Sequence, residues 1–167
     1  MHIDELERYW LIAVSVALGA FGAALLASVF IFRVQLPSPV ARIDPAEINE
    51  SAFAEPGLKD MGDNTYAALF VAQMWAFTPG EIRLPKGADV TFFVVSRDIS
   101  HGFFIEQHNV NLMLLPGQIA SATTRFNRPG TYRIICHEFC GPGHQNMVAT
   151  IIVEDTEQST AEEAAAE

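Results

Sequence analysis

A short segment near the end of the chain contains four side chains that could bind one metal centre: Cys136, Cys140, His144 and Met147. The segment reads CHEFCGPGHQNM, and its Gly-Pro-Gly run lets the backbone turn so that these side chains can converge. A fifth candidate, His101, follows the tripeptide Asp-Ile-Ser at the end of an earlier predicted strand. A β-sandwich can bring two such strand ends together, so we expect one site with five side-chain ligands.

The residue types limit which metal this segment would bind. Thiolates, imidazoles and a thioether suit copper or zinc, and they disfavour magnesium, calcium and manganese. Zinc would be satisfied by two cysteines and two histidines, whereas a mononuclear blue-copper site needs only one cysteine. Two thiolates can instead bridge two copper ions, each completed by a histidine. A disulfide between Cys136 and Cys140 is the alternative, and the three neighbouring ligands favour copper over it.

The elements that must position these ligands are short strands. Apolar runs alternate with turns that contain Pro-Gly or Pro-Lys-Gly, which is typical of an all-β Greek-key sandwich or barrel. No sustained helical period follows residue 32, so a βαβ fold is unexpected. The predicted strands are Tyr66–Ala72, Glu81–Leu84, Asp89–Ser96, Gly102–Ile105, Asn111–Leu115, Ile119–Phe126, Gly130–Cys136 and Val148–Glu154.

An uncharged segment of 24 residues, Tyr9–Phe32, precedes the predicted sandwich. As a helix it would extend roughly 36 Å, which is enough to cross a hydrocarbon core about 30 Å thick. A cleaved signal peptide would have a basic start and a shorter apolar core, whereas residues 2–8 contain three acidic residues and one arginine. We therefore expect an uncleaved membrane anchor, and its central small residues favour packing on a neighbouring helix.

The charge of the chain is concentrated at its end. Acidic residues outnumber basic ones by 20 to 10, and residues 154–167 contain six acidic residues and no basic one. This sign disfavours nucleic acid as a partner. The expected organisation is an anchor (1–36), a connecting segment (37–64), a β-domain (65–154) and a disordered acidic tail (155–167).

The ligand segment resembles the loop of the binuclear copper (CuA) centre in cytochrome c oxidase subunit II. The resemblance extends to Asp98-Ile-Ser-His101-Gly-Phe, to Leu115-Pro-Gly117 and to the strand that leads into Cys136. A single anchor before a short cupredoxin-like domain most resembles the B-family of haem–copper oxidases. Cys-x3-Cys-x3-His-x2-Met with an upstream histidine is a highly specific pattern, whereas Cys-x3-Cys alone would be weak.

The resemblance implies a role for each residue of the pattern. His101 and His144 would each bind one copper ion, and Cys136 and Cys140 would bridge both ions. Met147 would be an axial ligand through sulfur, and Glu138 would be the other through its backbone oxygen. The Glu138 side chain is also expected to be a candidate for an interfacial magnesium ion.

The resemblance also implies a function and partners. The chain would accept electrons from cytochrome c or a small copper protein and pass them to haem in oxidase subunit I. Oxygen reduction would take place in that subunit, with no catalytic residue in this chain. The anchor would lie in the lipid of the plasma membrane and the copper domain on its extracytoplasmic, or periplasmic, side.

Two further expectations concern the surface that receives electrons. Trp75 falls where the resemblance places the aromatic residue that accepts electrons, although a core position fits a tryptophan equally well. The residues around Met113 are largely apolar (Val110, Leu112, Leu114 and Leu115), so we expect the electron donor to dock mainly through apolar contacts.

Two other kinds of protein could use the same ligand types. Nitrous oxide reductase has a CuA domain beside a large propeller domain, for which this chain is too short. A membrane-anchored copper-delivery module, or a binding module stabilised by a metal, could use the same ligands.

Overall fold

The computed structural model describes residues 4–32 and 39–155, which form two separate units. The first unit contains helix α1 (Glu5–Phe30). Asp4 caps its N-terminus, and the Asp4 carboxylate accepts a hydrogen bond of 2.6 Å from the backbone N–H of Leu6. Among the described residues, α1 is the one helix with the length and apolar composition needed to cross a membrane. None of its residues is buried, which agrees with the expected membrane anchor.

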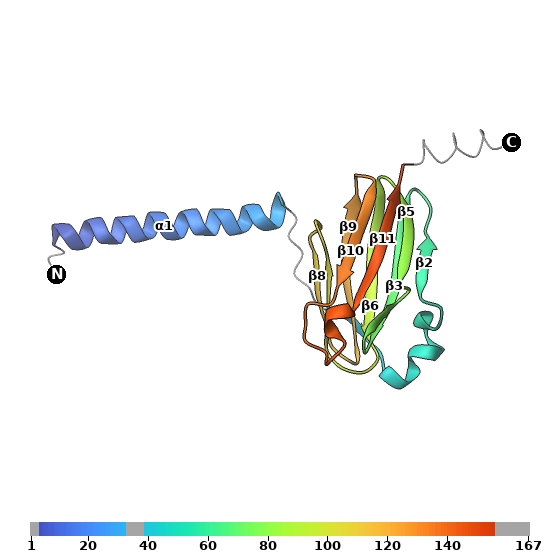
Figure 1. The fold of residues 1–167 in the computed structure, drawn as a ribbon. Coiled ribbons are helices and arrows are strands. Elements are labelled where there is room, and N and C mark those ends of the chain that lie inside the picture. The colour runs from blue at the N-terminus through green and yellow to red at the C-terminus, as the bar shows by residue number, and fades with distance from the viewer. Residues whose placement is uncertain (1–3, 33–38, 156–167) are drawn as a thin grey trace. The chain divides into compact units, whose positions relative to one another are not determined.

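The second unit is a sandwich of two β-sheets (Figure 1). One sheet has the strand order β1-β9-β6-β3-β2 with β4 paired to β3, and the other has the order β5-β11-β10-β7-β8. Two strand pairs, β3 with β6 and β5 with β11, are parallel, and the remaining pairs are antiparallel. The strands are β1 (Pro39–Arg42), β2 (Gly57–Asp60), β3 (Thr65–Gln73), β4 (Ala76–Thr78), β5 (Glu81–Pro85), β6 (Ala88–Ser96), β7 (His101–Ile105), β8 (Val110–Leu114), β9 (Gln118–Phe126), β10 (Gly130–Ile135) and β11 (Val148–Glu154).

The core between the sheets is built from alternating apolar side chains and a group of aromatic rings. Phe103 has ring centroids of Phe70, Phe77 and Phe92 within 5.4–5.7 Å, and all four side chains are buried. Such edge-on contacts add to the free energy gained by burying the rings. The eight predicted strands correspond to β3 and to β5–β11, so the predicted all-β, cupredoxin-like fold is confirmed.

Part of the segment 37–64, expected to be a connection, belongs to the sandwich. β1 pairs with β9 and β2 with β3, and between them lie two 3-10 helices, η1 (Pro45–Glu50) and η2 (Ala52–Ala54). Ile48 and Phe53 from these turns are buried in a second apolar cluster on β3 and β6. Two strands of only four residues within a polar segment lack the alternating pattern that would have predicted them.

The described residues end at Asp155, which forms an ion pair of 3.1 Å with Lys86. The rest of the expected acidic tail, 156–167, lies outside the described residues. The same holds for residues 1–3 and for residues 33–38, which span the expected boundary between anchor and connection.

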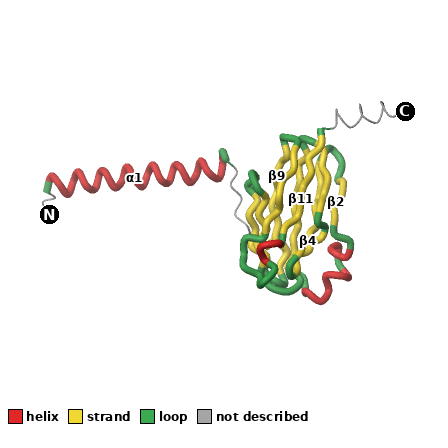
Figure 2. Tube along the Cα trace, viewed as in Figure 1, coloured by secondary structure: helices red, strands yellow, loops and turns green. Residues whose placement is uncertain are grey.

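The connection between β10 and β11 is the feature of the fold that prepares the site. These strands are antiparallel neighbours with Ile135 opposite Val148, so residues 136–147 leave one end of the sandwich and return to it. This connection is the orange loop of Figure 1, and its helical turn η3 (His144–Asn146) is red in Figure 2. β7 lies beside β10 and begins with His101, whose side chain is therefore close to the loop.

Candidate metal centre

The ligand loop is closed at its base by backbone hydrogen bonds. The N–H of Cys136 donates to the carbonyl of Met147 at 3.1 Å, which joins the first and last predicted ligands. Within the loop, Gly141 has φ of +111°, a conformation that favours glycine, and its carbonyl accepts from the N–H of His144 at 3.0 Å. These turns direct the side chains of the loop back toward the sandwich.

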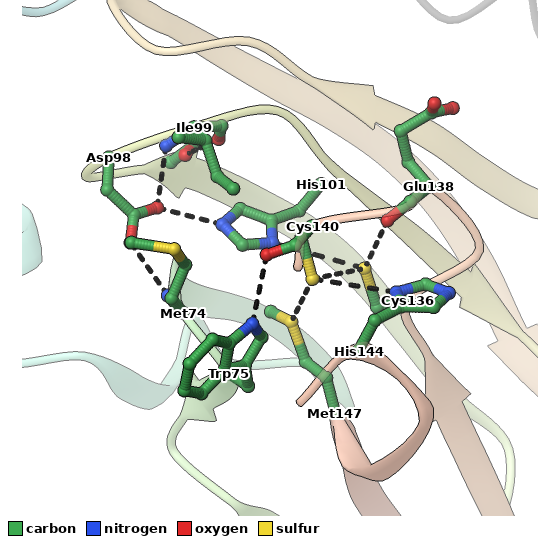
Figure 3. A network of polar contacts seen from close by, with 11 residues as sticks. Met74, Trp75, Asp98, Ile99, His101, Cys136, Glu138, Cys140, His144 and Met147 are labelled. Atoms are coloured by element: carbon green, nitrogen blue, oxygen red, sulfur yellow. Dashed lines mark hydrogen bonds and ion pairs between the residues drawn. The ribbon is translucent and has the colours of Figure 1, made fainter. Parts of the chain in front are cut away.

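The predicted ligands form one cluster around the two sulfur atoms (Figure 3). The Sγ atoms of Cys136 and Cys140 are 3.8 Å apart. His101 Nδ1 lies 4.0 Å from Cys136 Sγ, and His144 Nδ1 lies 3.5 Å from Cys140 Sγ. Met147 Sδ is 3.7 Å from Cys140 Sγ, and the carbonyl oxygen of Glu138 is 3.2 Å from Cys136 Sγ. The structure thus brings together all six predicted groups.

Both cysteines are free in this arrangement. A disulfide has an S–S length of about 2.05 Å, and the observed 3.8 Å is far longer, so both thiols are available as ligands of a metal ion. Two thiols, two imidazole nitrogens, a thioether and a carbonyl oxygen make a soft donor set that fits copper. Cys136, Cys140, Met147 and His101 are buried, so the site excludes most water.

His101 is oriented by a carboxylate on its far side. Its Nε2 lies 2.8 Å from Asp98 Oδ1, so this nitrogen donates its proton to the carboxylate and Nδ1 is free to face the sulfurs. Burial raises the pKa of the Asp98 carboxyl, but hydrogen bonds from His101 and from two backbone N–H groups outweigh that effect and lower the pKa overall. Asp98 therefore remains charged and fixes the direction of the ring.

Without metal, the Cys140 thiol holds its proton at neutral pH. Burial, followed by the hydrogen bond with Cys136, raises the pKa of the Cys140 thiol to about 11. A metal ion binds the thiolate, so loading the site must release protons.

Glu138 and Trp75 lie at the edge of the cluster. The Glu138 carbonyl faces the sulfurs, whereas its carboxylate points away from them (Figure 3). The Trp75 side chain comes from the turn between β3 and β4, and its Nε1 donates to the Cys140 carbonyl at 2.9 Å. Trp75 is 42% exposed, so it is a surface residue beside the loop and not a core tryptophan.

Two residues near the site have positions that the sequence did not reveal. Asp98 was part of the recognised motif, but its hydrogen bond to His101 depends on a turn after β6. Gly143 lies directly under the Trp75 ring. The position of an acidic residue three places before His101 was the signal that could have revealed the hydrogen bond between Asp98 and His101.

Replacing Asp98 with asparagine should weaken metal binding. The amide has one acceptor oxygen where the carboxylate has two, so it can accept from Nε2 of His101 or from the N–H of Met74 but not from both. We expect copper affinity to fall by about 10–100-fold, measured by competition with a copper chelator. Asp89→Asn, which removes only the surface ion pair with Arg125, is the matched control, and equal affinities for the two variants would contradict the role of Asp98.

Comparisons with known proteins agree with this site. Residues 72–156 match the family "Cytochrome C oxidase subunit II, periplasmic domain". The chain is 39% identical over 117 residues to cytochrome c oxidase subunit 2 of Thermus thermophilus, covering 68% of this chain and 87% of that protein.

Solved structures give the same result. The chain superposes with a TM-score of 0.77 and 31% identity on a chain from a haem–copper terminal oxidase dimer, covering 90% of this chain and 100% of that chain. The periplasmic domain of oxidase subunit II from Bradyrhizobium japonicum shares the fold, with a TM-score of 0.51, 16% identity and coverage of 57% of this chain and 88% of that one. The donor set indicates a copper centre, and the chain belongs to the cytochrome c oxidase subunit II family, as a membrane-anchored subunit of a haem–copper oxidase.

Proposed function

We propose that this chain binds two copper ions as a binuclear CuA centre and transfers electrons from cytochrome c, or a small copper protein, to haem in oxidase subunit I. The observation that carries the proposal is the placement of two free thiols 3.8 Å apart with one imidazole nitrogen beside each. When bound, the copper pair supplies a one-electron redox site.

The chain's own residues would divide the work of holding the centre. Cys136 and Cys140 would bridge the two ions, while His101 and His144 would each complete one of them. Met147 and the Glu138 carbonyl would also hold the centre, as weaker ligands.

The framework around these ligands supports efficient electron transfer. The site lies at the ends of paired strands, so its ligands are held by the sandwich and need to move little when the charge changes. Burial of the sulfurs and the carboxylate behind His101 would set the potential of the centre.

Each unit of the chain has its own proposed location. α1 would lie in the lipid of the plasma membrane, and the sandwich would lie on the extracytoplasmic side. The length of α1 and the match to a periplasmic domain support this placement.

The two-copper proposal predicts a stoichiometry and a spectrum. The full chain purified in detergent, loaded with copper and freed of excess metal, should retain two copper ions, and its EPR spectrum should be split by both nuclei. Cys140→Ser should abolish that spectrum because one bridge is lost. His137→Ala, in the same loop but without a ligand role, should retain it.

One copper ion per chain, or zinc without redox activity, would contradict the proposal. That result would favour a copper-delivery module or a binding module stabilised by metal.

The surface around the site supports an apolar docking area for the electron donor. Exposed apolar side chains come from the strand ends and loops near the ligands, and they are Met74, Trp75, Ile99, Met113, Leu115, Phe139 and Val148. The docking area expected from the sequence needs one correction, because Val110, Leu112 and Leu114 are buried core residues. They occupy alternate positions of β8, and Met113 between them points outward.

Trp75 is proposed as the residue that receives the electron, since it is exposed and also bonded to the Cys140 carbonyl. Trp75→Leu should slow electron uptake from reduced cytochrome c by about 10²-fold, the order of loss that follows when a reacting group is misplaced. Stopped-flow mixing with the copper-loaded chain would measure the rate. Phe139→Leu is the control for a second exposed aromatic side chain.

An unchanged uptake rate in a folded, copper-loaded Trp75→Leu chain would exclude this role. The same measurement over increasing salt tests the docking area, since apolar docking predicts a shallow salt dependence and electrostatic steering a steep one.

Glu138 is proposed to bind a magnesium ion at the interface with subunit I. Its carboxylate points away from the sulfurs and is free to take a hard cation. In the assembled oxidase, Glu138→Gln should lose interfacial magnesium by metal analysis while copper content stays constant. Full retention of magnesium would contradict the assignment.

A further inference from the structure

The indole of Trp75 lies directly on the backbone of the ligand loop. A Cβ atom added to Gly143 would lie 2.4, 2.6 and 2.7 Å from Cδ2, Cγ and Cε3 of the ring. These distances are well inside van der Waals contact, so the ring fills the space that a side chain at position 143 would need. The hydrogen bond from Trp75 Nε1 to the Cys140 carbonyl holds the other edge of the ring.

The backbone of Gly143 does not itself require glycine. Its φ of −92° and ψ of 2° lie in a region open to residues with a side chain. Gly141 differs, because its φ of +111° is a conformation that such residues rarely adopt. The path of the loop therefore requires glycine at position 141, where an added Cβ atom would also lie 3.1 Å from Trp75 Nε1. At Gly143 the much closer contact with the ring is what leaves no space for a side chain.

The turn that carries Trp75 is also fixed from the other side of the metal centre. The N–H of Met74 donates to Asp98 Oδ2 at 2.7 Å, and the other oxygen of this carboxylate accepts from His101. Figure 3 shows Met74 bonded to Asp98, and Trp75 bonded to the carbonyl of Cys140 in the ligand loop. The turn is thus held through Met74 and the ring through the Cys140 carbonyl, and the closer of the two glycine contacts of the ring is at Gly143.

We propose that Gly143 is a positioning residue for electron uptake: the absence of a side chain at this position keeps the Trp75 indole against the ligand loop. The inference rests on the proposed electron-transfer function and on the role of Trp75 in it. It assigns to Gly143 no contact with the metal ions or with the electron donor.

The chain offers a matched control for a ring packed on a glycine near a ligand. A Cβ atom on Gly102 would lie 2.6 Å from the ring of His137, and Gly102 follows the ligand His101 as Gly143 precedes the ligand His144. His137 is exposed and can turn away. Gly102→Ala therefore introduces the same change beside a ring that has no proposed role in electron uptake.

The test compares Gly143→Ala with Gly102→Ala in the full chain purified in detergent. Gly143→Ala should retain two copper ions and their EPR spectrum while electron uptake from reduced cytochrome c slows by about tenfold or more. In a Trp75→Leu background, Gly143→Ala should cause no further loss, because the two changes affect one contact. Gly102→Ala should retain the wild-type rate.

A second readout needs neither copper nor electron transfer. The chain has two tryptophans, so Trp10→Phe leaves Trp75 as the sole tryptophan fluorophore. In the metal-free Trp10→Phe chain, Gly143→Ala should shift the emission of Trp75 to longer wavelength, because the indole moves from the loop into water. Gly102→Ala should leave the emission unchanged.

Three outcomes would overturn the inference. The first is a Gly143→Ala chain with wild-type uptake and emission, and the second is a further loss of uptake when Gly143→Ala is added to Trp75→Leu. The third is a loss of copper in Gly143→Ala that Trp75→Leu does not restore. Failure of the proposed function looks different. In that case Trp75→Leu itself would leave uptake unchanged, while the emission shift would still report the contact at Gly143.

Discussion

The hydrogen bond from the Cys136 N–H to the Met147 carbonyl is the constraint on which the metal site depends. It continues the pairing of β10 and β11 beyond Ile135 and Val148, so the loop begins and ends on a rigid sheet. The intervening residues can then be glycine-rich and still hold their side chains in place. Since β7 lies beside β10, the same pairing also brings His101 to the sulfurs.

The buried thiol of Cys140 and the buried imidazole of His101 have different surroundings. Burial raises the pKa of the Cys140 thiol, which disfavours the charged form in the absence of metal. The imidazole of His101 has instead a charged carboxylate behind it, which compensates for its removal from water. No buried side-chain nitrogen or oxygen atom in the described part of the chain lacks a hydrogen-bond partner. The imidazole of His101 is therefore oriented before a metal binds, whereas the Cys140 thiol loses its proton when the metal binds.

The sequence predicted which candidate ligands lie together and most of the strands, because both depend on local patterns. Thiol, imidazole and thioether groups at short spacings limit the chemistry by themselves, and the alternation in β6 and β10 identifies buried strands. It did not predict β1, β2 or β4, because these short segments show no clear alternation of apolar and polar residues. The exposure of Trp75 was also undecided, since its contacts are with residues far away in the sequence.

The position of β11 in the chain has a consequence for the order in which the protein is made. β11 is the last strand among the described residues, yet it lies between β5 and β10 in its sheet and fixes the end of the ligand loop. During synthesis, both cysteines emerge before the strand that completes their surroundings. The full donor set therefore forms only when nearly the whole domain has been synthesised. A correctly filled site is in this sense a sign that the domain is complete, and a truncated chain would expose two thiols without the framework that selects their metal.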